Sequence, residues 1–408
     1  MVPRGLDLLR RLYRRARKAA GLLQGLGVTK GDRVGLMAWN HPAYLDLLFA
    51  GPLLGHVLTP FNHRLSLPEL KALHAYAEPK VLFYGEGFQG VAQALDPRAL
   101  PLEALLEGEE AGEEVRVDLE DPALLLFTGG TTGLPKGALL PYRQLLVNAV
   151  ETVFAWGLSR EDRYILATPM FHAALNALAT PLLYLGAQVV VEERFRPEEY
   201  LELLRLHRPT VLFLVPTMYQ MLLEAEGFAG ADLSSVRFAI SGGAPCPAPV
   251  REAFRSKGVR FKQGYGLTEC GVNCFTLELE EAEGYPESVG RPMPHLRARL
   301  VREDGKGGGG GRGRGALAFG ERGDEGLLPP PGGEREGLRL GRGKALAQDR
   351  GPGLPGRGGA LLHRGPQKGD VHLRRGERLS RGDRAGPLRP SGGERGGGGG
   401  GPRPQVGG

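Results

Sequence analysis

The sequence predicts an α/β protein with a large N-terminal domain and a tail of different character. Two observations support this: strand-like apolar runs alternate with helical stretches through about the first 300 residues, and glycine accumulates after them. Residues 305–408 hold 36 of the 65 glycines, with 20 basic and 10 acidic side chains. The basic balance of the whole chain therefore belongs to the tail, and it does not indicate a nucleic-acid or membrane partner for the folded part.

Periodicity and turn residues predict the elements in order. A helical pattern over residues 8–26 ends at Gly27, a residue suited to a helix C-cap. Short apolar runs bounded by turn residues predict buried strands at 33–38, 57–60, 80–84, 123–127, 164–167, 188–192, 211–215, 236–241 and 260–263. Apolar residues at helical spacing predict further helices at 43–54, 68–76, from Tyr142 onwards, 197–206 and 217–226. Such alternation favours two largely parallel sheet units, dividing near Asp121, within one large domain.

Other protein classes are disfavoured by simple features of the chain. No apolar run reaches the roughly 18 residues needed to span a bilayer, and the N-terminus lacks a signal-peptide core, so a cytoplasmic location is expected. Cys246, Cys270 and Cys274 lie in apolar surroundings, as reduced thiols do. Cys270 and Cys274 are four residues apart, but no histidine or further cysteine completes a set of metal ligands.

A glycine- and threonine-rich segment, residues 128–137, follows the predicted strand 123–127. Glycines let backbone N–H groups turn toward an anion, threonines add hydroxyl donors, and Lys136 adds a positive charge. This combination suits a triphosphate, although the position of Lys136 differs from a Walker A loop and an ordinary hairpin is the alternative. The candidate phosphate-binding residues are Thr128, Gly129, Gly130, Thr131, Thr132, Gly133 and Lys136.

A second segment, residues 263–269, follows the last predicted strand. Tyr265 offers a ring face for a purine, and its flanking glycines, Gly264 and Gly266, allow close approach. Thr268 offers a hydroxyl at the phosphate, and Glu269 offers a hard oxygen ligand for Mg²⁺. Taken alone, the segment is equally well read as a strand-end turn with a solvated glutamate.

Together these segments resemble the AMP-forming acyl- and aryl-CoA synthetase family, with its luciferase and peptide-synthetase adenylation relatives. The resemblance covers about residues 10–304, and it departs at Gly129, where the family usually has serine. It implies that Gly242, Gly243 and Ala244 form an adenine-binding turn together with Gly264, Tyr265 and Gly266. It also implies an acyl pocket that includes His172, Asn176, Gly266 and Cys270, and a catalytic set of Thr268, Glu269 and His172, with Glu269 as the metal ligand.

The resemblance implies a two-step reaction in the presence of Mg²⁺. A carboxylate, expected to be a fatty acid, attacks the α-phosphate of ATP to give an acyl-adenylate and pyrophosphate, and the thiol of CoA then attacks the adenylate. Such chemistry depends on positioning the substrates and neutralising phosphate charge more than on covalent catalysis. An aryl-CoA ligase and an amino-acid adenylation enzyme are the alternatives, although no acidic residue is clearly placed to hold a substrate amine. Homodimer formation is left open.

The family continues with a Thr-Gly-Asp motif, a hinge and a small C-terminal domain, none of which is readable in residues 305–408. With codons chosen freely, residues 349–359 and 363–382 can be encoded so that a one-nucleotide deletion restores motifs of the family, in order. We therefore predict domains at 1–304 and 305–408, the second being a disordered, frameshifted tail that leaves adenylation impaired. A rival hypothesis is a non-catalytic nucleotide- or RNA-binding protein that uses the Arg/Gly tail, in which Phe319 is the only aromatic residue.

Overall fold

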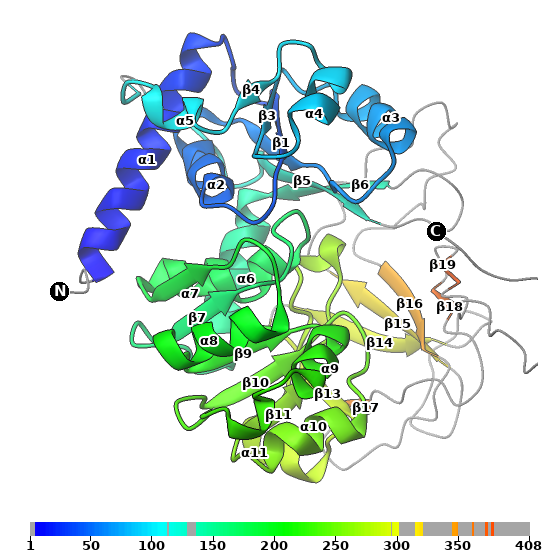
Figure 1. The fold of residues 1–408 in the computed structure, drawn as a ribbon. Helices are drawn as coiled ribbons and strands as arrows, with labels where there is room; N and C mark the ends of the chain where they lie inside the picture. Colours follow the sequence, from blue (N-terminus) through cyan, green and yellow to red (C-terminus); the bar gives the residue numbers. More distant parts are fainter. Residues whose placement is uncertain are drawn as a thin grey trace, which may run out of the picture.

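The computed structural model describes residues 5–111, 114–128, 136–294 and 296–301, and five short strands between residues 315 and 378. Two α/β units make up most of the described chain, one above the other in Figure 1. The upper unit contains the N-terminal elements and the lower unit contains those from α6 onwards, with antiparallel strands beside it. No helix in the described ranges is long and apolar enough to cross a membrane.

The N-terminal unit is a six-stranded sheet with the strand order β4-β3-β1-β2-β5-β6, in which only β5 and β6 pair antiparallel. Its strands are β1 (Arg33–Met37), β2 (Val57–Pro60), β3 (Val81–Tyr84), β4 (Leu100–Pro101), β5 (Pro122–Thr128) and β6 (Lys136–Pro141). Its helices are α1 (Gly5–Gly25), α2 (Ala43–Leu54), α3 (Leu67–Ala77), α4 (Gln89–Leu95) and α5 (Ala104–Glu107).

Helices cover both faces of this sheet, which is why β1 is buried along almost its whole length. Leu36 packs in a cluster with α1 and α2, whereas the adjacent Met37 packs in a cluster with α3 and α4. The first cluster continues into the second unit and includes Phe171 and Ile240. The two sheet units therefore share one core, as expected for a single large domain.

The second unit contains a parallel sheet of β9, β10 and β11 and a parallel pair of β7 and β8. Thr210 N–H donates to the Arg163 carbonyl at 2.9 Å, which joins the β7 edge to the start of β9. Its strands are β7 (Arg163–Leu166), β8 (Gln188–Val191), β9 (Val211–Leu214), β10 (Phe238–Ser241) and β11 (Arg260–Gln263). Its helices are α6 (Tyr142–Ala155), π-helix η1 (Leu175–Ala179), α7 (Thr180–Leu185), α8 (Pro197–His207), α9 (Pro216–Glu224), α10 (Ala248–Arg255) and α11 (Leu279–Gly284), with 3₁₀ turns η2 (Phe228–Gly230) and η3 (Thr268–Cys270).

The predicted division near Asp121 is wrong by about twenty residues. Strand β5 joins the first sheet through the pairing of Leu58 with Leu124, and β6 pairs back on β5 from Pro141 to Lys136. The N-terminal unit therefore extends to Pro141, and α6 begins the next unit. The sequence pattern located both β5 and α6 but not the strand to which β5 is hydrogen-bonded, because that partner is distant in the sequence.

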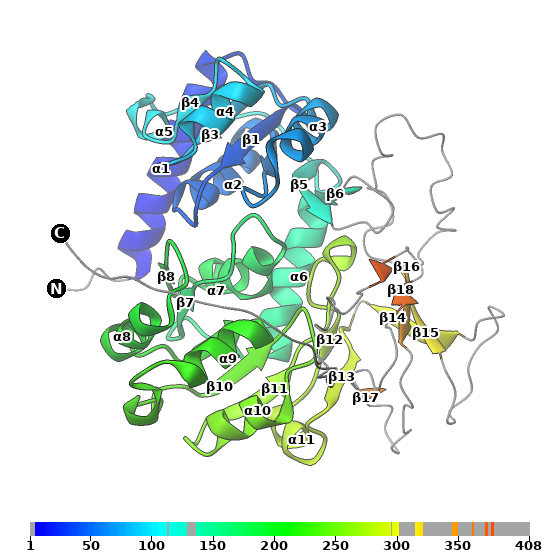
Figure 2. The same ribbon diagram turned by 45° about the vertical axis from the view of Figure 1, so that its right-hand side comes forward.

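Antiparallel strands follow the second unit, and several of them come from the tail (Figure 2). They are β12 (Phe275–Thr276), β13 (Ser288–Pro292), β14 (Arg297–Val301), β15 (Gly315–Gly320), β16 (Ala345–Asp349), β17 (Leu361–Leu362), β18 (His372–Leu373) and β19 (Glu377–Arg378). Strand β15 pairs with both β14 and β16. The sequence analysis predicted no strands here; the rest of the predicted disordered tail lies outside the described residues.

Lys262, in β11, is buried between two aromatic rings. Its Nζ lies 4.9 Å from the ring centre of Trp156 and 5.0 Å from that of Phe238, and it donates to the Leu277 carbonyl at 3.3 Å. Burial lowers the pKa of Lys262 from its ordinary 10.5 to about 7. The unfolded chain therefore binds more protons than the folded chain between these two pH values.

We predict that the stability of the protein rises with pH from about 7 to 9 and that Lys262→Met removes most of this rise. The free energy of unfolding is greatest above the ordinary lysine pKa. It falls as the pH decreases toward the pKa of Lys262 in the folded chain, by up to about 1.4 kcal/mol per pH unit. Urea unfolding at several pH values measures the slope. Lys257→Met is the control, because Lys257 contacts the Phe228 ring but is partly exposed; an equal change in both variants would contradict the prediction.

Candidate active site

The two predicted adenine-binding turns lie side by side at the carboxyl ends of β10 and β11. These parallel strands pair with Ser241 opposite Gln263, and Gly264 N–H donates to the Ser241 carbonyl at 2.7 Å. Residues Gly242 and Gly243 leave β10 at the same edge where Gly264 leaves β11, and Gly243 has a φ of 83°. Ala244 follows directly. This edge of a parallel sheet is where α/β proteins commonly bind ligands.

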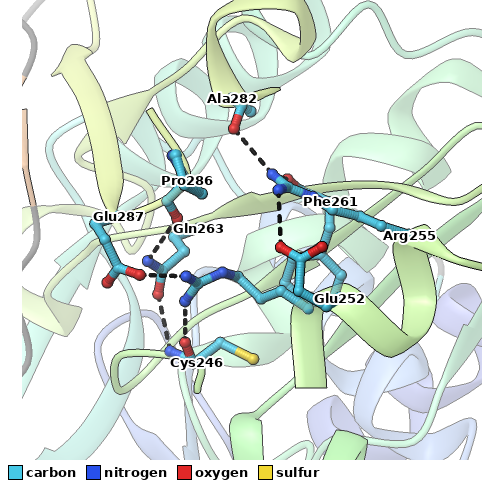
Figure 3. A network of polar contacts seen from close by, with 9 residues as sticks. Cys246, Glu252, Arg255, Phe261, Gln263, Ala282, Pro286 and Glu287 are labelled. Atoms are coloured by element: carbon cyan, nitrogen blue, oxygen red, sulfur yellow. Dashed lines mark hydrogen bonds and ion pairs between the residues drawn. The ribbon is translucent and has the colours of Figure 1, made fainter. Parts of the chain in front are cut away.

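The predicted adenine-binding turn after β10 is held in place by a polar network (Figure 3). Gln263 accepts a hydrogen bond from Cys246 N–H at 2.8 Å and donates to the Pro286 carbonyl at 3.1 Å. The buried Arg251 donates to the Cys246 carbonyl and pairs with Glu287. The segment after Ala244 is thus fixed to β11 on one side and to the chain before β13 on the other.

Gly266 lies where the loop after β11 folds back on itself. A Cβ added at Gly266 would lie 1.3 Å from the Val272 carbonyl oxygen, so no other residue fits this backbone. Val272 itself has a φ of 83°, which is a strained conformation for a β-branched side chain. Between them, Thr268 and Glu269 lie on the 3₁₀ turn η3, both partly exposed, and Cys270 is buried.

The two ends of the predicted phosphate-binding loop meet at the β5–β6 hairpin. Thr128 pairs with Lys136 across the hairpin, and the Thr128 hydroxyl lies 3.4 Å from the Lys136 carbonyl oxygen. Turn η3 lies beside β6, so the hairpin and the Thr268–Glu269 pair are neighbours. The other predicted loop residues, Gly129, Gly130, Thr131, Thr132 and Gly133, lie outside the described residues.

The predicted acid-binding residues lie after β7. The ring centre of His172, an exposed side chain, lies 4.5 Å from that of Phe171, and partial desolvation together with the positive charge of Arg64 lowers the pKa of His172. Asn176 is buried in the π-helix η1, and its side-chain oxygen accepts a hydrogen bond from Thr180 at 2.9 Å. A π-helical turn within helical structure is frequently associated with function.

Helix α6 connects these regions through polar side chains on one buried face. Gln144 donates to the Glu269 carbonyl at 2.8 Å, and Asn148 donates to the Asn176 carbonyl at 2.8 Å. Asn148 also accepts a hydrogen bond from Asn273 N–H at 3.1 Å. Gln144 and Asn148 are not among the residues predicted from sequence; with Thr152 they recur every four residues on the buried face of α6, and this spacing was the available signal.

Magnesium binding by Glu269 fits the structure. Among the described residues no cluster of three or more His, Cys, Asp or Glu side chains could hold a metal ion by itself. Mg²⁺ in nucleotide-binding enzymes commonly keeps several waters and takes only one or two protein carboxylates beside the phosphates. The partly exposed Glu269, whose main chain is fixed by Gln144, suits that arrangement.

A cavity of about 490 Å³ lies next to the predicted acid-binding segment. Its lining includes Trp39, His63, Arg64, Arg194 and Met218, at the carboxyl ends of β1, β2, β8 and β9. The guanidinium of Arg194 lies 4.0 Å from the Trp39 ring centre. None of the site residues predicted from sequence lines this cavity, but the His63 ring contacts that of Phe171, the neighbour of His172, at 4.9 Å.

The sequence of the chain is similar to those of known proteins. The AMP-binding enzyme family matches residues 9–321. The chain is 36% identical over 299 residues to a feruloyl-CoA synthase of an Amycolatopsis species, covering 72% of this chain and 61% of the relative. It is 32% identical over 322 residues to a long-chain-fatty-acid–CoA ligase of Thermus thermophilus, covering 72% and 60%. The chain thus spans about three fifths of the length of the curated relatives it matches.

Solved structures show the same fold. The crystal structure of ATP-bound MatB from Rhodopseudomonas palustris has a TM-score of 0.73 and 26% sequence identity, covering 86% of this chain and 72% of that protein. The α/β fold of two largely parallel sheet units, predicted from sequence, is confirmed by this similarity and by the strand pairings. The family match spans well over half of the chain and includes every predicted site residue. The chain therefore belongs to the AMP-binding enzyme family.

Proposed function

We propose that this chain binds ATP and a carboxylic acid and catalyses formation of an acyl-adenylate, the first step of an acid–CoA ligase. The parallel register of β10 and β11 carries this proposal, because it sets the Gly242–Gly243 turn beside Gly264 and Tyr265. Tyr265 then offers its ring to the adenine, and Thr128 and Lys136 offer a hydroxyl and a charge to the phosphates. The CoA ligases among its relatives support the same reaction class.

The residues of the chain act by positioning the two substrates. The carboxylate of the acid attacks the α-phosphorus of ATP, and pyrophosphate leaves with the electrons of the broken P–O bond. Lys136 offsets negative charge on the phosphates, and Thr268 donates to a phosphate oxygen. Glu269 would hold a Mg²⁺ ion, which would neutralise further phosphate charge when bound. His172, with its ring against Phe171, lines the acid pocket.

We infer that the CoA thiol reaches the adenylate from the cavity beside Phe171. In this second step the thiol sulfur attacks the acyl carbon, AMP leaves and the thiol proton passes to solvent. CoA carries several phosphate charges, and Arg64 and Arg194 line this cavity. The cavity also lies on the acid side of the site, through the contact of His63 with Phe171.

The class of acid is proposed from the relatives. A fatty acid is the substrate predicted from sequence, and the similarity to a feruloyl-CoA synthase supports an aryl acid as the second candidate.

Acid-dependent pyrophosphate release by the purified 408-residue chain decides between them, with palmitate, ferulate and phenylalanine as test acids. We expect pyrophosphate release with palmitate or with ferulate, and only when both ATP and Mg²⁺ are present. Release with phenylalanine alone, or none with any acid, would contradict the proposal.

We further propose that the reading frame shifts near Lys306 and that this lowers the turnover of the chain as written. The absence of a readable Thr-Gly-Asp motif after Gly305 supports this. Sequencing the encoding DNA against an uninterrupted relative is the direct test, together with the intact mass of the protein from its native source. An unbroken frame, or pyrophosphate release as fast as that of a full-length relative, would refute it.

A further inference from the structure

Two buried amide side chains lie between the acid-binding and nucleotide-binding segments. Asn148, on α6, donates through Nδ2 to the Asn176 carbonyl at 2.8 Å and accepts through Oδ1 from Asn273 N–H at 3.1 Å. Both Asn148 and Asn273 are almost completely buried. A single side chain thus bonds to the main chain of both segments.

Asn273 makes the complementary connection from the nucleotide side. Its Nδ2 donates to the Ala177 carbonyl at 2.8 Å and to the Thr152 hydroxyl, also at 2.8 Å. Thr152 lies one helical turn after Asn148 on α6. The amide pair therefore fixes two successive carbonyls of η1, those of Asn176 and Ala177, relative to the loop that carries Glu269.

Both segments held by the amide pair have unusual backbones. Residues of η1 form a π-helical turn, in which Thr180 N–H bonds to the Leu175 carbonyl five residues earlier. On the other side, Val272 has a φ of 83°, directly before Asn273. Strained backbone persists only where surrounding contacts enforce it, and it is concentrated at functional sites. The amide pair supplies such contacts to both segments.

We propose that Asn148 and Asn273 are positioning residues that couple the binding of the acid to the binding of ATP. A shift of η1 on acid binding moves the carbonyls of Asn176 and Ala177, and the amide pair transmits this movement to the Thr268–Glu269 turn. Each substrate then raises the affinity for the other by the same factor, as linkage requires. This inference rests on the proposed function, because it assigns η1 to the acid and the turn to the nucleotide.

The test is a coupling measurement by calorimetric titration. The affinity of α,β-methylene-ATP, which cannot form the adenylate, is measured with Mg²⁺ in the absence and presence of saturating acid. The acid is the one of the panel that gives the greatest pyrophosphate release. For the native chain we expect the acid to raise the affinity by about five-fold or more. In Asn148→Leu, which keeps the side-chain size without hydrogen-bonding atoms, we expect a factor near one, with the affinity in the absence of acid changed by less than about two-fold.

Two further variants separate coupling from folding. Thr152→Val removes the hydroxyl that accepts from Asn273 and leaves Asn148 intact, so we expect an intermediate coupling factor. Val150→Ala, on the exposed face of the same helix, is expected to behave as the native chain. If Asn148→Leu does not fold, the Thr152→Val result decides: an undiminished factor overturns the proposal, and a reduced factor supports it.

Other results would overturn the proposal. Full coupling in Asn148→Leu would show that the amide pair transmits nothing, and an equal loss of affinity with and without acid would show a merely structural role. A native chain that releases pyrophosphate with acid but shows a coupling factor of one refutes the coupling alone and leaves the proposed function standing. A native chain that releases none with any acid refutes both.

Discussion

Gly266→Ala is expected to remove nucleotide binding at the candidate site and to destabilise the fold by about 3 kcal/mol or more, at the upper end of overpacking effects. The new Cβ would lie 1.3 Å from the Val272 carbonyl oxygen and 2.5 Å from its carbon, and both are backbone atoms. Val272 is already in the left-handed region, so it has little freedom to move aside. Urea unfolding and titration with α,β-methylene-ATP measure the two effects.

The control is Gly284→Ala, at the end of α11, where an added Cβ meets no atom within 4 Å. We expect its stability within about 0.5 kcal/mol of the native chain, as for most surface substitutions. If Gly266→Ala folds with native stability and native affinity, the loop from Gly266 to Val272 cannot be packed as described.

Glu269→Gln is expected to lower acid-dependent pyrophosphate release by about 100-fold or more, the effect typical of losing one charge-stabilising group at a reacting phosphate or carbonyl. The amide keeps the size of the side chain but binds Mg²⁺ poorly. Because Gln144 holds the main chain of Glu269, we expect the fold and the position of η3 to be retained. The rate is measured across a Mg²⁺ titration, with unfolding measured in parallel.

An exposed carboxylate provides the control for this substitution. Glu226→Gln, in the segment after α9, is expected to leave both the rate and the Mg²⁺ dependence unchanged. If Glu269→Gln shows the native Mg²⁺ dependence, Glu269 is not the metal ligand. If it loses activity together with thermal stability, its role is structural.

Local patterns predicted most elements of the two units correctly. The helix Ala43–Leu54 and the strands Val57–Pro60 and Arg260–Gln263 have the predicted bounds, because each is a short apolar or periodic run between turn residues. The unit boundary was wrong because the pairing of Leu58 with Leu124 joins residues that are far apart in sequence. Strand β15 was missed because a glycine-rich segment gives little hydrophobic signal.

The candidate site was predicted as motifs but not as an assembly. Gly264 and Tyr265 were identified from residue types, and their neighbours at the end of β10 from a resemblance. The roles of Asn148 and Asn273 were not identified, because a buried asparagine is informative only once its partners are known. Those partners, the main-chain atoms of η1 and of the loop after η3, come from tertiary packing and leave no trace in local composition.

The β5–β6 hairpin separates the predicted phosphate-binding loop from the sheet that carries it. The pairing of Thr128 with Lys136 fixes both ends of the loop at the spacing of neighbouring strands, about 4.8 Å, whatever sequence lies between them. Loop-closure cost also changes slowly with length, by about 0.6 kcal/mol per doubling. Substitutions between Thr128 and Lys136 can therefore change the side chains offered at this end of the hairpin while the sheet beneath stays the same.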